Sequence, residues 1–162
     1  MACNLITKNG GALSSGNFMA LIKSTLADGI ISGCSITANG ASITVAAGRI
    51  VAGGALVEVE STVVSASSAG ELVLRIDTSG EGTASILART AVTLTKQDIT
   101  GSGTVYEVQL ATFGFTSGAV SGLSAKIGTA KPVGAASSPT ITYGTGEPTG
   151  GNDGDIYFKI ES

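Results

Sequence analysis

Few residues of this chain could do chemistry, and their types exclude most catalytic mechanisms. Histidine is absent from all 162 residues, which removes Ser-His-Asp and Cys-His catalysis together with the commonest zinc ligand. The two cysteines, Cys3 and Cys34, cannot form a four-thiolate metal site. We expect two reduced thiols rather than a disulfide. The residue types therefore predict no metal and no cofactor.

Glu58 and Glu60 form a pair of carboxylates with a spacing that glycosidases use. Alternate residues of a strand share one face and lie about 7 Å apart, within the range of carboxylate separations in such enzymes. A sugar cleft also needs aromatic walls, and the chain has no Trp. We interpret both residues as solvated charges on a strand, so the sequence does not predict an enzyme.

Two glycine-rich segments resemble ligand-binding motifs only in part. Residues 150–155, GGNDGD, match one calcium-binding nonapeptide repeat, but those sites need stacked copies to complete the oxygen shell of the ion. Gly80 and Gly82 supply two glycines of a dinucleotide fingerprint, without the third glycine or a following helix. We interpret the first segment as a turn before a strand and the second as a hairpin turn.

Charge is scarce in this sequence and bears on its partners. Only 13% of the residues are charged, the net charge is −3, and the nine basic residues are scattered singly. Without a basic stripe, nucleic-acid binding is not expected. A surface with so few charges favours burial against other copies of the chain or against other proteins, because a low-charge monomer associates at its strand edges.

The N-terminal residues lack the continuous apolar run of a secretory signal. Residues 29–48 carry no charge, but their Ser, Thr, Asn and Gly content is too polar for a membrane span. We therefore expect synthesis in a cytoplasm, with no signal peptide and no membrane insertion.

One segment has the apolar spacing of a helix. Its apolar residues recur at i, i+3, i+4 and i+8 and so predict a single stripe: Phe18, Leu21, Ile22 and Leu26. Asn17 is the expected N-cap and Gly29 the expected stop. The stripe is predicted to pack on a sheet of the same chain or on a neighbouring subunit.

From residue 30 onward the pattern predicts β-structure. Asn39-Gly40, Gly53-Gly54 and residues 79–82 are hairpin turns between short runs of alternating polarity. In the run 55–64, the valines Val57, Val59 and Val63 are predicted to share one face. Further strands are predicted at 71–77, 84–87 and 105–115. Residues 71–77 repeat the pattern of a half-buried strand, with apolar side chains on one face and polar side chains on the other. The predicted fold is mainly β, a compact antiparallel β-sandwich or small barrel with one N-terminal helix and a C-terminal strand appendage.

The organisation along the chain follows from these elements. We expect an N-terminal arm (1–16), a helix plus β-module (17–128), a Pro/Ala/Ser linker (129–140) and a C-terminal docking tail (141–162). The tail has an apolar face whose burial is worth roughly 4–8 kcal/mol, formed by Ile156, Phe158 and Ile160. This face predicts that the tail docks on the main β-domain or on another chain.

The order of motifs within residues 71–115 is distinctive. A strand reading LVLRID precedes a polar segment LTKQDITGSG and a strand opening YEVQLA. This stretch resembles a module of bacteriophage tail-fibre and baseplate proteins, and residues 17–60 and 144–160 extend the likeness. Residues 122–126 depart from the pattern because they lack its Asp and Arg.

The resemblance implies a non-enzymatic virion structural protein, made in the bacterial host cytoplasm. It would be an adaptor or fibre component of the tail tip or baseplate that contacts other virion proteins. It would assemble as a homotrimer or a higher ring, with the helix stripe and the tail face as the assembly interface. Two alternatives remain open: a capsid head-fibre or decoration protein, and an adhesin module that binds a host-surface glycan through solvent-facing tyrosines, for which the chain offers Tyr106, Tyr143 and Tyr157.

Overall fold

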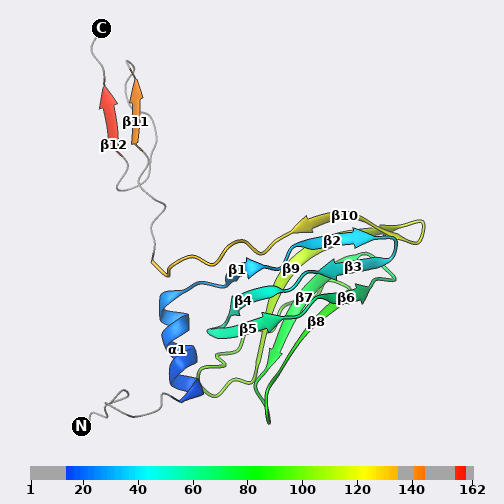
Figure 1. Ribbon diagram of the computed structural model, residues 1–162, viewed down its shortest axis with the longest axis horizontal. Helices are drawn as coiled ribbons and strands as arrows, with labels where there is room; N and C mark the ends of the chain where they lie inside the picture. Colours follow the sequence, from blue (N-terminus) through cyan, green and yellow to red (C-terminus); the bar gives the residue numbers. More distant parts are fainter. Residues whose placement is uncertain (1–13, 135–140, 145–155, 160–162) are drawn as a thin grey trace.

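The computed structural model describes residues 14–134 and, within the C-terminal region, the strands at 141–144 and 156–159 (Figure 1). Outside the described residues lie most of the predicted N-terminal arm, with Cys3, and the glycine-rich segment 150–155 and Ile160 of the tail. The elements run in the order α1 (Ser15–Thr25), β1 (Gly29–Gly33), β2 (Ile36–Asn39), β3 (Ser42–Val45), β4 (Gly48–Ala52), β5 (Ala55–Val59), β6 (Thr62–Ser65), β7 (Gly70–Asp77), β8 (Thr83–Arg89), β9 (Val105–Thr116), β10 (Ala119–Ala125), β11 (Ile141–Gly144) and β12 (Ile156–Lys159).

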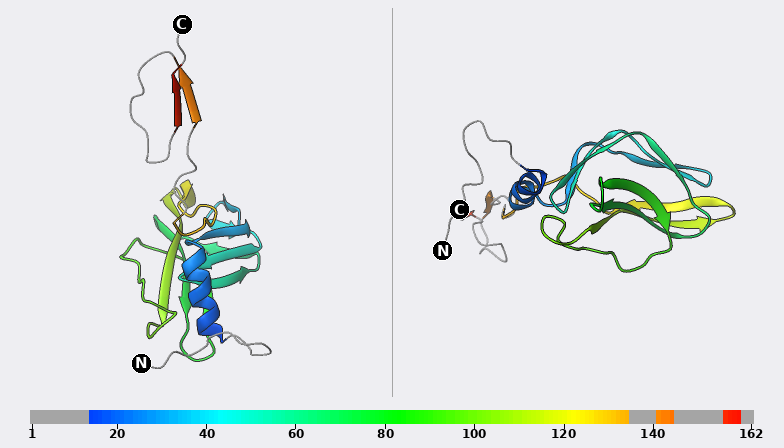
Figure 2. Two further views of the ribbon diagram at one scale, coloured as in Figure 1. Left: turned by 90° about the vertical axis from the view of Figure 1, so that its left-hand side faces the viewer. Right: turned by 90° about the horizontal axis from the view of Figure 1, so that it is seen from below.

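Two layers of antiparallel strands form the body of the protein. One layer is a four-stranded sheet in the order β10-β9-β7-β8, and the other contains two three-stranded sheets, β1-β4-β5 and β2-β3-β6. The second layer arches over the first in the right-hand view of Figure 2. The sheets of the described residues remain separate, so the predicted sandwich is confirmed, whereas the alternative of a closed barrel is not observed.

The two three-stranded sheets are one meander that bends across all of its strands. The chain passes from β1 to β2, from β3 to β4 and from β5 to β6 at the same level. Gly33 and Cys34 have φ values of 62° and 57° at this bend, a region that most side chains avoid. A Cβ on Gly48 would lie 2.6 Å from the sulfur of Cys34, so the bend requires glycine there.

This bend overturns one prediction from the alternating pattern. The predicted strand 55–64 is interrupted after Val59, and β6 begins only at Thr62. Val57 and Val59 are buried as expected, but Val63 is 63% exposed. The interruption shifts the alternation by one residue, and a shift of one residue turns every following side chain to the other face.

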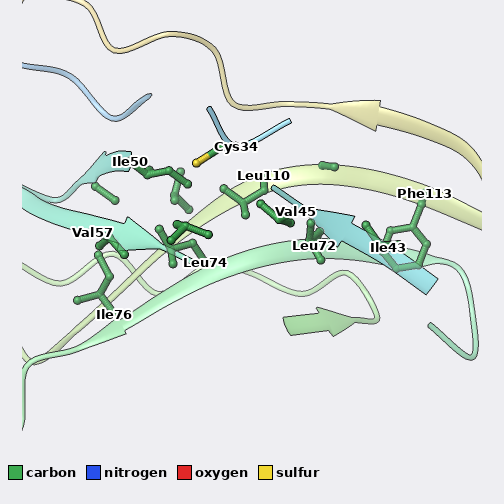
Figure 3. Close-up of a cluster of buried hydrophobic side chains, with 14 of the residues drawn as sticks. Cys34, Ile43, Val45, Ile50, Val57, Leu72, Leu74, Ile76, Leu110 and Phe113 are labelled. Carbon is green, nitrogen blue, oxygen red and sulfur yellow. The ribbon is translucent and has the colours of Figure 1, made fainter. Parts of the chain in front are cut away.

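The hydrophobic core lies between the two layers (Figure 3). It receives residues from both: Ile43, Val45, Ile50, Leu72, Leu74, Leu110 and Phe113 are buried members of one cluster. Cys34 is a free thiol buried in the same cluster, and this burial raises its pKa. The structure thus makes Cys34 a small core residue.

The outer face of the four-stranded sheet is covered by residues 90–104, which we call the strap. The alternating pattern predicts a polar, solvated face here, yet Glu71 is 2% and Glu107 1% exposed. Val73, between them on the same face, is also fully buried. The strap contains the LTKQDI segment, and its backbone pairs with β9 through the bridge between Lys96 and Tyr106. The polar face is therefore interior, and the expectation of a half-buried strand is wrong here.

Arg89 joins the two buried carboxylates beneath the strap. Its Nε donates to Glu71 at 3.1 Å, and its two terminal nitrogens donate to the oxygens of Glu107 at 2.9 and 3.1 Å. Arg75 also donates to Glu107, at 3.1 Å. The strap completes the arrangement, because the backbone N–H of Thr95 donates to Glu107 at 2.9 Å. Every buried side-chain nitrogen and oxygen of the described residues has a hydrogen-bond partner.

Glu107→Gln tests how much the buried ion pair contributes to stability. We expect the free energy of unfolding to fall by about 3–5 kcal/mol, because the variant leaves Arg89 with one anionic partner in a buried site. Glu58→Gln is the matched control, since its ion pair with Arg49 is exposed and such pairs contribute about 0–1 kcal/mol. Urea denaturation of both variants gives the comparison, and equal losses would contradict the assigned role.

The same variant gives a pH test. The hydrogen bonds from Arg89 lower the pKa of the Glu107 carboxyl from 4.5 to about 2, so between these pH values the unfolded chain binds the proton more readily. Stability of the wild type therefore falls as pH drops from about 4.5 toward 2. Glu107→Gln has no carboxyl at this position, so the difference in unfolding free energy between the wild type and the variant should shrink as the pH falls over that interval. Parallel stability curves would argue against the pairing.

Candidate assembly interface

Helix α1 lies across the end of the sandwich, next to the turn between β4 and β5 (Figures 1 and 2). The helix begins earlier than its apolar spacing predicts. Ser14, not Asn17, is the N-cap, and its side chain accepts a hydrogen bond from the Asn17 N–H. The helix ends at Thr25, so Gly29 is not its stop but the first residue of β1. Ser14 serves as the N-cap because the short hydroxyl of a serine at this position accepts a hydrogen bond from the backbone N–H three residues further along the chain.

The helix lies so close to the β4–β5 turn that there is no room for a side chain on the turn residue Gly54. A Cβ on Gly54 would lie 2.4 Å from the carbonyl oxygen of Met19 and 2.9 Å from the Cβ of Lys23. Gly53, the other turn residue, faces the ring of Tyr106, where a Cβ would lie 2.8 Å from a ring carbon. Both glycines have positive φ. The Gly53-Gly54 dipeptide that predicts the hairpin therefore also forms the surface on which the helix packs.

Asp28 connects the helix end, the turn and the four-stranded sheet. One of its carboxylate oxygens accepts a hydrogen bond from the Gly53 N–H at 2.8 Å, and the other accepts from the Tyr106 hydroxyl at 2.7 Å. Desolvation and the bond to Asp28 raise the pKa of the Tyr106 phenol far above its ordinary range. The hydroxyl of Tyr106 is thus used in a structural hydrogen bond. Glycan binding would need a tyrosine that faces the solvent, and Tyr106 does not fit that role.

Lys23 fixes the helix to the strap. Its ammonium donates to Asp98 at 2.7 Å, and Asp98 also accepts from the hydroxyl of Thr100 at 2.7 Å. The bond to Lys23 is the main reason why the pKa of Asp98 falls to about 2. In the same last turn of the helix, the carbonyl of Thr25 accepts a hydrogen bond from the N–H of Val133 at 2.9 Å. The first residues of the predicted linker therefore pair with the helix.

The predicted apolar stripe divides into two faces. Ile22 and Leu26 are half-buried, and Met19, which the stripe did not include, packs against the core cluster. The side chains of Phe18 and Leu21 are 44% and 53% exposed. The helix buries no residue completely. Two large apolar side chains, three positions apart, therefore stand on an exposed helix face.

The second predicted interface belongs to a ribbon formed by β11 and β12. These strands pair in parallel, with Ile141 beside Ile156 and Tyr143 beside Phe158. The ribbon stands apart from the sandwich in Figure 1. The structure therefore does not bring Ile156 and Phe158 together with the helix face of the same chain. Docking of the tail remains a prediction.

The paired carboxylates Glu58 and Glu60 border two shallow grooves at the edge of the sandwich. One groove, about 380 Å³, lies between β5 and β8 and includes Leu74 and Ser85 in its lining. Glu58 forms an exposed ion pair with Arg49 at 3.4 Å. Within residues 14–134, no cluster of three or more potential metal-ligating side chains occurs. Gly80 and Gly82 lie at the β7–β8 turn with positive φ, as the hairpin interpretation predicts.

The strongest contacts of this region were not predicted from the sequence. Lys23, Asp28 and Asp98 tie the helix to the turn and the strap. Their signal is modest: each is an isolated charge in a weakly charged segment, and such a charge often has a specific partner. Residues 14–134 contain no helix long and apolar enough to cross a membrane.

A scan against protein-family models finds no match to this chain, and a search of curated proteins finds no relative at a significant level.

We expect no hydrolase activity from the purified protein on bacterial cell-wall polysaccharide. The reason is that no aromatic side chain of the described residues lines either groove beside Glu58 and Glu60, whereas a sugar-binding cleft needs aromatic walls. Release of reducing sugar over time gives the measurement. Turnover that disappears in Glu58→Gln or Glu60→Gln, but persists in the strap variant Asp98→Asn, would overturn the interpretation of both carboxylates.

Proposed function

We propose that this protein is a non-enzymatic structural protein of a bacteriophage particle, an adaptor or fibre component of the tail tip or baseplate that assembles as a homo-oligomer. The observation that carries the self-assembly is the exposed pair Phe18 and Leu21 on a helix whose other side is fixed to the sandwich. A rigidly held apolar face of this kind is typical of a protein contact.

The build of the sandwich supports the role of a rigid adaptor. The close approach of Gly54 to the helix backbone favours this orientation of the helix, and the exposed ion pair between Lys23 and Asp98 adds a minor contact. The stretch 71–115, which resembles tail-fibre and baseplate modules, forms β7, β8, the strap and β9. The motif residues of the resemblance thus build the scaffold that holds the helix, and phage identity rests on that resemblance.

Self-assembly through the helix is tested by substituting Leu21 with Asp. Because Leu21 is half-exposed, the chain should stay folded while the desolvated contact is lost, so the wild-type oligomer should dissociate to a 15.9 kDa species. Ala20→Asp is the matched control, with the same charge on a different exposed position of the helix. Multi-angle light scattering gives the mass and circular dichroism confirms folding.

Two results would count against this proposal. A wild-type protein that stays at 15.9 kDa across micromolar concentrations contradicts self-association. An oligomer that Leu21→Asp and Ala20→Asp leave equally intact would move the contact away from the helix. The place in the particle is decided separately by antibody labelling of virions: labelled tails agree with the proposal, and labelled capsids would favour a head-fibre or decoration protein.

A further inference from the structure

One side of the sandwich ends in strands that have a free edge. β5, β6 and β8 are each the last strand of their sheet, and they lie along the same side of the body in Figure 1. The backbone N–H and C=O groups on the outer side of such a strand have no partner in the sheet. The groove of about 380 Å³ between β5 and β8 opens here and is lined by residues of all three strands.

The edge of β8 lacks the protection that the edges of β1 and β10 have. Ile30 of β1 exchanges two backbone hydrogen bonds with the segment 128–130, and β10 has a break in its register between Ser121 and Ser124. β8 instead pairs with β7 along its whole length without a bulge, and residues 83–88 contain neither a charge nor a proline. Proteins use bulges, charges and proline to block free edges. The edge of β8 is therefore open to an added strand.

The inner face of the four-stranded sheet is uncovered at this edge. Ala84 pairs with Ile76, whose side chain belongs to the core cluster. Paired residues share a face and faces alternate along a strand, so Ala84 and Ile86 are both on the core-facing side. Ile76 is buried, yet Ala84 is exposed and Ile86 only half-buried. The second layer therefore does not extend over this part of β8, and the groove reaches the apolar core.

The rim of the groove is acidic. Glu58 and Glu60 line it, and among the described residues no basic side chain does. Glu58 has its exposed ion pair with Arg49 on the side of the second groove, and an exposed pair of this kind is weak. Both carboxylates are therefore available to a cation that approaches from outside.

We propose that this side of the sandwich binds an extended, basic segment of a partner protein, which adds as a strand to the edge of β8. The backbone of the segment pairs with β8 beside Ala84, and its apolar side chains cover Ile86 and the floor of the groove. Its Lys or Arg side chains reach Glu58 and Glu60 at the rim. Backbone pairing and apolar burial supply the affinity, while the charges select the partner.

A second copy of this chain fits the surface less well than a basic segment does. A two-fold contact places the same surface on both sides, so it brings Glu58 and Glu60 of one copy toward those of the other. Like charges across a contact are unfavourable. The groove contains no residue of α1, so this binding is independent of the self-assembly proposed above.

The binding is measured by fluorescence anisotropy, with a labelled synthetic peptide of alternating Val and Lys titrated with the full-length protein. The matched control peptide alternates Val and Glu, which keeps the apolar content and reverses the charge. We expect only the Val/Lys peptide to bind, with an affinity that falls as NaCl is raised. Amide hydrogen exchange should slow within residues 83–86 of the complex, because strand addition gives the edge N–H groups a partner.

A pair of lysine variants locates the site. Ala84→Lys should weaken binding by about tenfold or more, because it places a charge like those of the peptide at the groove. Ser124→Lys adds the same charge at an exposed position of β10 and should bind the peptide as the wild type does. Glu60→Gln should weaken binding less and reduce its dependence on salt. Circular dichroism checks that each variant is folded.

The remaining outcomes each overturn the proposal. Failure of the Val/Lys peptide to bind, or equal binding of both peptides, removes the basic partner. Equal weakening by Ala84→Lys and Ser124→Lys removes the site, and binding without slower exchange at residues 83–86 removes the added strand. A peptide-free oligomer that Ala84→Lys alone dissociates assigns the edge to a second copy. Binding that appears only after deletion of residues 1–13 assigns it to the N-terminal residues of the chain itself.

Discussion

Arg89 and the two carboxylates that it joins are the interaction on which the other contacts depend. Glu71 and Glu107 come from neighbouring strands, β7 and β9, and both are almost fully buried. Two like charges in that position would be strongly unfavourable without a guanidinium between them. With Arg89 in place, each carboxylate retains oxygens that accept backbone N–H groups of Val92 and Thr95. A loop without regular structure is thereby fixed on the sheet.

The position of the strap then determines the position of the helix. Once Thr95 is bound to Glu107, the following residues place Asp98 where it binds Lys23 of α1. From the other side, Tyr106 reaches across to Asp28, the residue that precedes the first strand. The helix is therefore held by polar contacts to the strap and by close backbone packing on the β4–β5 turn. This explains how it can remain fixed although none of its residues is fully buried.

Local patterns predicted the strands and hairpins because their causes are local. Asn39-Gly40 and Gly53-Gly54 mark turns through backbone freedom alone, and the structure has hairpins at both. The alternation at Val63 was predicted wrongly because the bend depends on neighbours in space. The N-cap was also predicted wrongly, although its cause is local: the hydroxyl of Ser14 accepts a hydrogen bond from the N–H of Asn17. The burial of Glu71 and Glu107 could not be read from alternation, which cannot distinguish a face covered by water from one covered by a strap. Apolar spacing likewise found Phe18 and Leu21 but not which side of the helix meets the sandwich.

The ion pairs of the sandwich divide between a buried network and an exposed surface. The strongest ion pairs lie inside, beneath the strap, where Arg75 and Arg89 neutralise Glu107. Charges used in this way do not keep the outside of the protein soluble, and only 13% of the residues are charged. Four charged residues, Glu71, Arg75, Arg89 and Glu107, form this internal network. They hold the strap on the sheet, whereas the apolar side chains of Phe18 and Leu21 lie exposed on the helix. The stability of the sandwich therefore depends on a few buried charges as well as on its apolar core.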